Sequence, residues 1–187
     1  MERNYLSALG INLKVRFSKE EIEREVARLA REINEAYAGE ELLAVVVLNG
    51  AFIFAADLLR AVQVPLQVDF VKLSSYVGTS TSGQVLVKKD LECSVEGRHV
   101  LVVEDIVDTG ITLSFLLEML RSRGAKSVRI CTLVNKKAHR ERPIVPEYVG
   151  MECGSGFLVG YGLDLDERMR ELSAIYEVTD TPLKGTA

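Results

Sequence analysis

The sequence predicts an α/β fold in which a mostly parallel sheet is flanked by helices. Apolar runs at 42–48, 99–103 and 128–134 show no polar alternation, which is typical of strands buried on both faces. Segments of helical periodicity separate these runs, as in folds built from strand-helix-strand units. With 187 residues and 48% hydrophobic content, the chain can bury one sizeable core, so we expect a single domain over residues 1–187.

The first expected element is a helix that begins after Ser18. Ser18 and Glu21 have the spacing of a capping box, and apolar residues recur at helical spacing up to Gly39. The later elements are a strand at 42–48, a helix to about 62, strands at 67–75, 85–88 and 99–103, a helix at 112–123 and a strand at 128–134.

Helical signals fade after residue 134. Pro143 and Pro146 interrupt any helix, and short strands are expected at 149–153, 157–161 and 175–178. We expect the C-terminal segment, about 143–187, to form a small hood over the functional site. Residues 77–84 are rich in Gly, Ser and Thr, which predicts a mobile loop.

The composition argues against several function classes. A net charge of −4 is unlike the basic excess of nucleic-acid binders. No apolar run has transmembrane length and the N-terminus lacks a signal peptide's apolar core, so we expect no membrane partner and a cytoplasmic location. Cys93, Cys131 and Cys153 form no Cys-x-x-Cys pair, which indicates neither a disulfide framework nor a structural zinc site.

Residues 100–113 carry the strongest functional signal. Glu104 and Asp105 come at the carboxyl end of a buried strand, where ligands bind in open α/β sheets. The turn that follows, Asp108-Thr109-Gly110-Ile111-Thr112, offers hydroxyls and the unpaired N–H groups of a helix start, which suit a phosphate. Carboxylates beside a phosphate site indicate a divalent cation between them, and Mg²⁺ has that ligand preference.

This segment resembles the phosphoribosyl-pyrophosphate (PRPP) signature of type I phosphoribosyltransferases, which is an apolar strand, two acids, two apolar residues and then Asp-Thr-Gly with a hydroxyl residue. Further segments resemble the hypoxanthine-guanine phosphoribosyltransferases, and from about Leu42 onward they follow the same order as in that family. They are 48–52, 73–76, 133–136 and 157–164, and Arg170 follows at the expected distance.

The resemblance implies a type I phosphoribosyltransferase-like fold and a purine-salvage transferase. Such an enzyme uses Mg²⁺ to transfer the 5-phosphoribosyl group of PRPP to N9 of hypoxanthine or guanine, giving IMP or GMP and pyrophosphate. It also implies small-molecule substrates and a homodimer or homotetramer.

The same resemblance implies a role for each site residue. Asp108 is the expected general acid/base at purine N7, a role that typically contributes about 10²–10⁴ in rate. The expected contacts to PRPP are Glu104, Asp105, Asp108, Thr109, Gly110, Ile111 and Thr112, and those to pyrophosphate are Asn49, Gly50 and Arg170. The expected contacts to the base are Ile106, Lys136, Phe157, Leu158 and Asp164. The mobile loop is expected to contribute Ser75 and Tyr76, and the expected metal ligands are Glu104, Asp105 and Asp164.

Structural alternatives stand beside these roles. Asp108 could be only a helix N-cap, and Glu104 with Asp105 only a solvated strand end. Lys136 could be a solvated lysine, and Phe157 and Ile106 could be plain core. Arg170, expected on a short polar helix, could form a surface ion pair with Glu167 or Glu171.

Asn49 departs from the family, which often has lysine at this position. One pyrophosphate or subunit contact is therefore in doubt. Residues 48–52 resemble the family's first loop, which often holds a cis peptide after its first polar residue. We therefore expect Asn49–Gly50 to adopt or switch to that form.

Other function classes fit less well. A regulator that keeps this fold usually needs a basic surface or an added DNA-binding module, and a P-loop enzyme needs Gly-x-x-x-x-Gly-Lys-Ser/Thr, which does not occur here. A phosphoribosyltransferase for xanthine or a pyrimidine is the nearest rival.

Overall fold

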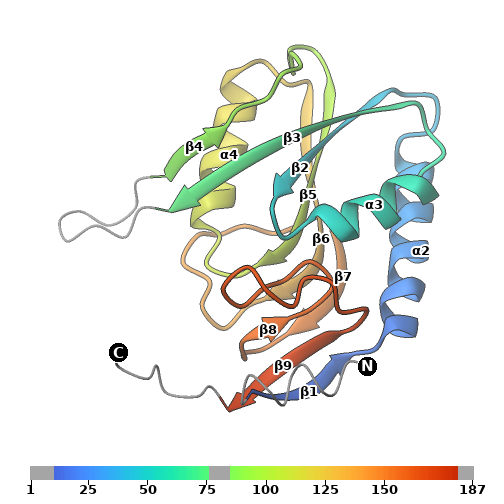
Figure 1. Ribbon diagram of the computed structural model, residues 1–187. Helices are drawn as coiled ribbons and strands as arrows, with labels where there is room; N and C mark the ends of the chain where they lie inside the picture. The colour runs from blue at the N-terminus through green and yellow to red at the C-terminus, as the bar shows by residue number, and fades with distance from the viewer. Residues whose placement is uncertain (1–10, 76–84, 181–187) are drawn as a thin grey trace.

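A six-stranded sheet forms the centre of the molecule in the computed structural model, which describes residues 11–75 and 85–180 (Figure 1). Its order is β4-β3-β2-β5-β6-β7, and every neighbouring pair is parallel except β3 and β4. The strands are β2 (Leu42–Leu48), β3 (Leu66–Ser75), β4 (Val85–Lys89), β5 (His99–Val107), β6 (Ser127–Lys136) and β7 (Tyr148–Cys153). The predicted mostly parallel sheet is confirmed.

Helices cover the two faces of this sheet. They are α2 (Lys19–Ala36), α3 (Phe52–Ala61) and α4 (Ile111–Ser122). The predicted capping box is confirmed, because the Ser18 hydroxyl accepts from the Glu21 N–H and the Glu21 carboxylate accepts from the Ser18 N–H. Within the described ranges, no helix has both the length and the apolar character needed to cross a membrane.

Side-chain alternation along the strands divides the core in two. Leu42 and Val46 of β2 pack in the cluster that contains the buried faces of α2 and α3. Leu43 and Val45 point the other way, into the cluster that contains α4. This period of two explains why the central strands are apolar at every position.

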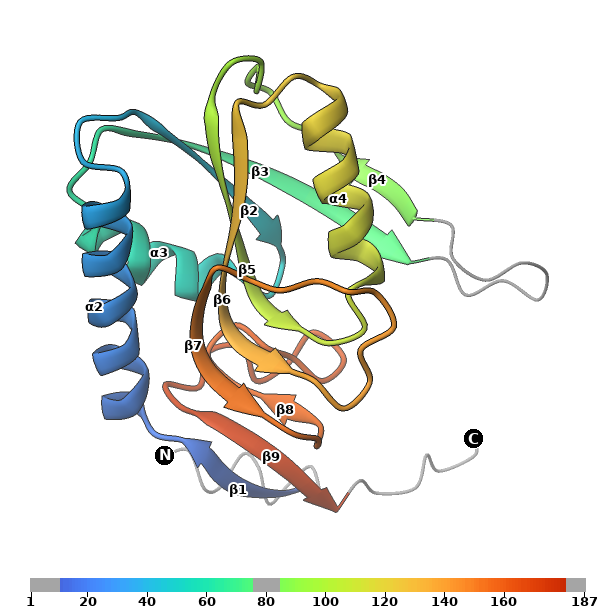
Figure 2. The same cartoon turned by 180° about the vertical axis from the view of Figure 1, so that it is seen from behind.

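A separate three-stranded sheet forms the hood, in the order β1-β9-β8. Its strands are β1 (Asn12–Phe17), β8 (Leu158–Val159) and β9 (Ile175–Asp180). The hood lies beyond the carboxyl ends of β5 and β6, toward which their arrows point in Figure 2. A hood over this edge of the sheet was expected, but the N-terminal β1 was not predicted to be part of it.

The assignment of residues 149–153 to the hood was wrong. This segment is β7, which extends the central sheet beside β6. Its outer edge is held by α2, because Arg28 Nη2 donates to the Val149 carbonyl oxygen at 2.5 Å. A long-range contact of this kind leaves no signal in the local sequence.

Candidate active site

The candidate site lies where β2, β5 and β6 end, on the side of the hood. β5 extends to Val107, so that Glu104 and Asp105 lie within the strand and not just beyond it. The parallel register pairs Val107 with Asn135, which brings Lys136, the last residue of β6, beside Asp108. Two residues that are 28 positions apart in sequence thus meet at one sheet edge.

A pocket of about 250 Å³ opens at this edge. Its lining brings together six of the predicted site residues, which are Glu104, Ile106, Asp108, Thr109, Gly110 and Thr112. Gly110 has φ +80° and forms the N-cap of α4, so the backbone turns there before the helix begins. The loop and the first turn of α4 thereby line one wall with hydroxyls and with the N–H groups of a helix start, of which that of Ile111 donates to Thr109 Oγ1 at 3.4 Å.

Asp108 is held by Lys136 and does not cap the helix. Lys136 Nζ donates to Asp108 Oδ2 at 3.0 Å, and α4 has no side-chain cap, so the N-cap alternative was wrong. The other oxygen, Oδ1, is buried and has no hydrogen-bond partner among the residues that the structure describes. His139, which sequence reasoning missed, places its Nδ1 3.7 Å from that oxygen.

Lys136 is one of the few buried charged residues. Only 7% of the residue is exposed, so the alternative of a solvated lysine was wrong. Arg140, also missed from the sequence, fixes the backbone around it by donating to the carbonyl oxygens of Lys136 at 2.9 Å and Val107 at 3.1 Å. The same guanidinium reaches the Ile144 carbonyl oxygen at 2.5 Å and so anchors the loop that follows β6.

Glu104 and Asp105 form a half-buried pair of carboxylates. Burial, and then the neighbouring charge of Asp105, raise the pKa of Glu104 well above its ordinary value, and burial also raises the pKa of Asp105. A solvated strand end would not have this character. Gly50 packs against the pair, since a Cβ there would lie 1.7 Å from Asp105 Oδ2.

The carboxylate pair fits a divalent cation that takes its remaining ligands from substrate. A bound cation would compensate the charges that burial disfavours, and Mg²⁺ commonly uses only one or two protein carboxylates. Asp164 is not gathered with them: no cluster of three or more His, Cys, Asp or Glu side chains with metal-binding geometry occurs among the described residues.

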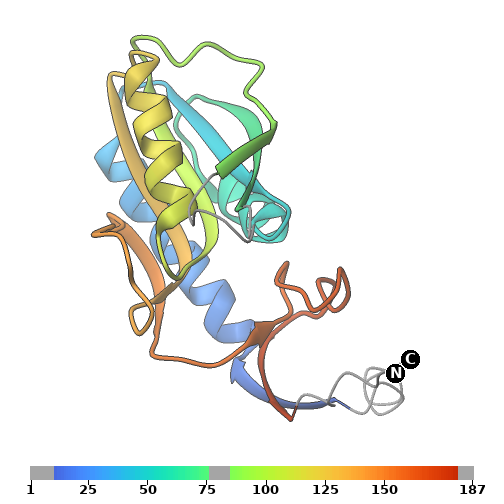
Figure 3. The same cartoon turned by 90° about the vertical axis from the view of Figure 1, so that its left-hand side faces the viewer.

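The hood contributes Arg170 on a segment of turns that projects toward the start of α3 (Figure 3). The expected short helix around Arg170 was wrong, because Asp166, Glu167 and Met169 have positive φ angles. Arg170 donates to the Gly162 carbonyl oxygen at 2.7 Å, and its Nη2 lies 3.0 Å from Asp164 Oδ1.

The expected ion pair of Arg170 with Glu167 is present, at 2.8 Å. The arginine side chain is nevertheless only 17% exposed, so this is not a simple surface pair. Gly162 brings the segment against the first loop, since a Cβ on Gly162 would lie 2.1 Å from the Gly50 carbonyl oxygen.

The first loop contains a cis peptide one position earlier than expected. It joins Leu48 to Asn49 and not Asn49 to Gly50. Gly50 is needed here for its close approach to Asp105, which a side chain would block. Asn49 Oδ1 accepts from Lys72 Nζ at 3.1 Å, a contact that sequence reasoning missed although the β2–β3 register pairs Lys72 with Leu48.

Two of the remaining predicted base contacts, Phe157 and Leu158, lie between β7 and β9, and the third, Ile106, lies in β5. Phe157 is 52% exposed, so the plain-core alternative was wrong, whereas Leu158 is buried in β8. Ile106 packs against the core, as one of its two expected roles requires, and it also lines the pocket; its contact with the base stays a prediction. Ser75 ends β3, and Tyr76 and the predicted mobile loop at 77–84 lie outside the described residues.

Comparisons with known proteins agree with this geometry. The model of the phosphoribosyl transferase domain family matches residues 17–166. The chain is 46% identical over 168 residues to a hypoxanthine-guanine phosphoribosyltransferase of Mycobacterium avium, which covers 86% of this chain and 83% of the relative. The chain belongs to the hypoxanthine-guanine phosphoribosyltransferase family. It is therefore an enzyme of the transferase class.

Two further comparisons support membership of the hypoxanthine-guanine phosphoribosyltransferase family. A relative from Bacillus subtilis (strain 168) is 47% identical over 164 residues, which cover 87% of this chain and 91% of the relative. A crystal structure of a hypoxanthine-guanine phosphoribosyltransferase from Bacillus anthracis superposes with a TM-score of 0.85 at 37% identity, covering 91% of this chain and 99% of that one.

Proposed function

We propose that this chain transfers the 5-phosphoribosyl group of PRPP to N9 of hypoxanthine or guanine in purine salvage. The observation that carries the assignment of its residues is the pair of Lys136 and Asp108 beside the phosphate-type turn. A buried ammonium and a carboxylate with one unpartnered buried oxygen form a polar site that a ligand can complete.

Lys136 supports selection of a 6-oxopurine. An ammonium has three donors and no acceptor, so it can bond an exocyclic oxygen but not an exocyclic amine. Because Lys136 is buried, it requires a partner at all times. Without a base, the Lys136 ammonium donates to Asp108. With a base bound, the exocyclic oxygen of the base can accept that hydrogen bond, which frees the Asp108 carboxylate to interact with the purine.

Asp108 is the general acid/base in this proposal. Its Oδ1 lacks a hydrogen-bond partner within the described chain, with His139 Nδ1 3.7 Å away, so it can take a proton from the purine N7 position or return one to it. Phe157, half-exposed at the start of the hood, is free to stack on the base. The backbone of Leu158 would lie near the 2-position of the purine.

The turn from Asp108 to Thr112 is proposed to hold the 5′-phosphate of PRPP. The N–H groups at the start of α4 would serve this purpose without a charged side chain, so Ile111 is compatible with it. Glu104 and Asp105 would hold Mg²⁺ near the ribose. When bound, this ion neutralises charge on the departing pyrophosphate.

Asp164 would join the metal site only after it is released from Arg170, with which it pairs at 3.0 Å. Asn49, Gly50 and Arg170 would contact the pyrophosphate from the first loop and the hood. Ser75 and Tyr76 would come from the loop that covers the reacting atoms and excludes water.

Assembly and location are part of the same proposal. We expect a homodimer or homotetramer, supported by the exposed aromatic side chains of Phe52 and Phe70 beside an apolar pocket. A cytoplasmic location is supported by the cysteines at positions 93, 131 and 153, which are free thiols in the structure.

A panel assay tests the function. The purified chain is incubated with PRPP, Mg²⁺ and one of hypoxanthine, guanine, xanthine, adenine or uracil, and nucleotide formation is followed. We expect turnover of hypoxanthine and guanine, none of adenine and loss of activity in excess chelator. Robust turnover of adenine or uracil, or full activity with chelator, would contradict the proposal.

A further inference from the structure

Four polar side chains from three parts of the chain meet beside the first loop. Lys72 of β3 donates to Asn49 at 3.1 Å, and Arg170 of the hood donates to Glu167 at 2.8 Å. Asn49 and Lys72 also act on the Glu167 carboxylate and lower its pKa, which relates the two pairs to each other. The contact between Gly162 and the Gly50 carbonyl oxygen holds hood and loop together at this place.

The members of this cluster differ sharply in how firmly they are held. Arg170 is 17% exposed and is fixed by the Gly162 carbonyl oxygen and by Asp164. Glu167 is 73% exposed, so its carboxylate can move into solvent at little cost. Lys72 is half-buried on β3, next to the loop.

The charges around Glu167 converge on its carboxylate. A side-chain hydrogen bond from Arg170, with smaller effects from Lys72 and Asn49, lowers the pKa of Glu167 below its ordinary value. Arg170 also acts electrostatically on Asp105 of the carboxylate pair. The fork of a guanidinium binds carboxylates and phosphates by the same geometry, so an anion brought by a substrate would seek the same donors.

We propose that Glu167 occupies the diphosphate site of the empty enzyme as an internal competitor, and that Lys72 supplies the second protein cation of that site. In the bound state the diphosphate of PRPP would replace the Glu167 carboxylate on Arg170 and would also bind Lys72. Lys72 would then provide the positive charge that Asn49 does not, with the Asn49 amide holding the ammonium at the loop. This inference rests on the proposed function, which places pyrophosphate at Arg170 and Gly50.

Direct binding of inorganic pyrophosphate in the presence of Mg²⁺, measured by calorimetry on the full chain, tests the inference. Glu167→Gln keeps the size of the side chain but removes its charge, and we expect pyrophosphate to bind roughly twofold to fivefold more tightly, as for loss of a partly exposed ion pair. Lys72→Met should weaken binding about tenfold, as for loss of a charged donor.

Matched variants separate these effects from a general change in net charge. Glu171→Gln makes the same charge change at an exposed residue that lines a different pocket, with Lys19 and Asp57, and should leave pyrophosphate affinity unchanged. Lys14→Met is the corresponding control for Lys72, on an exposed position of β1. Glu167→Ala and Lys72→Gln repeat the test if either first variant does not fold.

Arg170→Gln distinguishes failure of this inference from failure of the proposed function. If Arg170→Gln binds pyrophosphate as the wild type does, the diphosphate site is misplaced and the proposed residue roles fail. If Arg170→Gln weakens binding while Glu167→Gln binds no more tightly than Glu171→Gln, the competitor role is overturned. Wild-type affinity in Lys72→Met would overturn the role of Lys72.

Discussion

Asp108 and Lys136 neutralise each other in the empty site, and each needs a substitute partner when a base enters. The carboxylate has an oxygen to spare, whereas the ammonium is enclosed by protein. Substitutions of the two residues should therefore have different kinetic signatures, because in the proposed function Asp108 acts in the transition state and Lys136 mainly binds the base.

Asp108→Asn should lower kcat by about 10²–10³ while the KM for PRPP changes little. The amide keeps an acceptor for Lys136 but cannot exchange a proton with the purine, and the loss falls in the range of a removed general acid/base. Steady-state rates provide the test, measured with varied hypoxanthine at saturating PRPP and with varied PRPP at saturating hypoxanthine. A variant with wild-type kcat would show that Asp108 pairs with Lys136 but does not act as the general acid/base.

Lys136→Met should lower kcat/KM for hypoxanthine by roughly 10–100-fold, since a hydrogen bond from a charged donor contributes about 1.5–3 kcal/mol. The KM for PRPP should be nearly unchanged. Lys137→Met is the control, because the neighbouring Lys137 is 70% exposed and pairs with Glu152 at 3.1 Å. Equal effects of the two substitutions on base kinetics would show that Lys136 does not contact the base.

Among the elements, β3 is tied to the connection between β4 and β5 by one buried carboxylate. Asp69 accepts from the backbone N–H groups of Phe70 at 2.7 Å, Glu92 at 2.7 Å and Cys93 at 2.8 Å. Asp69→Ala should lower the free energy of unfolding by about 2–4 kcal/mol, because three part-buried backbone N–H groups lose their acceptor. Urea denaturation measures the change. Asp90→Ala is the control, because Asp90 forms an exposed ion pair with Arg123 and its loss should cost under about 1 kcal/mol.

The contribution of Asp69 should depend on pH in a defined direction. Burial by itself would raise the pKa of Asp69, but the three N–H groups together hold that pKa below its ordinary value of 3.8. The pKa of Asp69 is lower in the folded state than in the unfolded state. Its stabilisation is therefore fully present above the unfolded-state pKa and is lost as pH falls through the folded-state pKa. The stability difference between wild type and Asp69→Ala should therefore shrink between pH 6 and pH 3; a constant difference would contradict this.

Elements with strong local signals could be predicted from the sequence, and those made by distant partners could not. β2 begins and ends where its apolar run does, and α2 begins at its capping box. β1 was missed because its partner β9 lies more than 150 residues away. The strand at 149–153 was predicted but assigned to the wrong sheet, because nothing local shows that it pairs with β6 or that Arg28 holds its edge.

The same limit applies within the site. The carboxylates and the turn after β5 are contiguous in sequence and were predictable, whereas Lys72, His139 and Arg140 reach the site only through strand register and loop folding. A resemblance to a family could assign Lys136 and Arg170. It could not reveal that Arg170 pairs with Asp164 as well as with Glu167, the pair that the sequence offered as an alternative.

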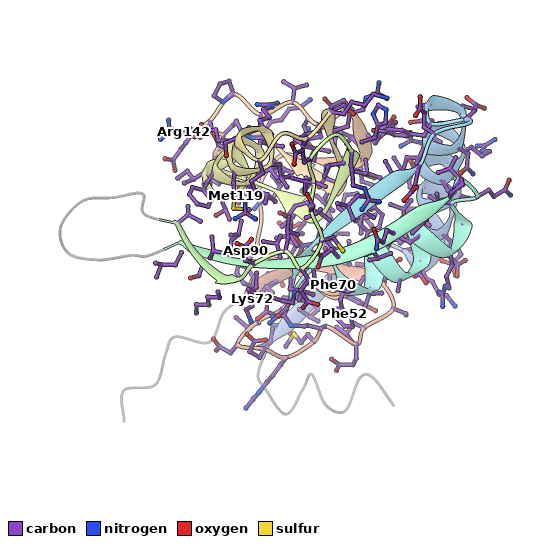
Figure 4. The ribbon with its side chains drawn as sticks, turned by 90° about the horizontal axis from the view of Figure 1, so that it is seen from above. Phe52, Phe70, Lys72, Asp90, Met119 and Arg142 are labelled. Atoms are coloured by element: carbon purple, nitrogen blue, oxygen red, sulfur yellow. The ribbon has the colours of Figure 1, made fainter. Side chains whose placement is uncertain are left out.

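The molecule as a whole presents one apolar surface between α3 and β3. Figure 4 shows Phe52 near Phe70, and Lys72 follows Phe70 by two residues on the same strand. Phe52, Val68 and Phe70 are 45%, 38% and 40% exposed and line a pocket that is almost wholly apolar. Exposed apolar patches of this kind commonly mark protein interfaces.

Phe70→Asp should therefore shift the chain toward the monomer. A carboxylate at the centre of an apolar interface costs several kcal/mol, enough to dissociate a dimer at micromolar concentration. Sedimentation velocity gives the mass of each variant, and Val145→Asp, at a residue that is 81% exposed elsewhere, is the control. A wild type that sediments as a monomer would remove self-association from the proposal.

The pairing of β1 with β9 has a consequence for the order in which the enzyme is built. Residues Asn12 to Phe17 cannot complete their sheet until Ile175 to Asp180 have been synthesised. The central sheet, with the turn from Asp108 to Thr112, contains no strand from this last segment and can form earlier during translation. Arg170 is carried by the hood, so its guanidinium reaches the first loop only when the hood has closed. A nascent chain that stops before β9 would therefore hold the proposed phosphate turn but would lack the complete sheet of the hood, which carries Arg170.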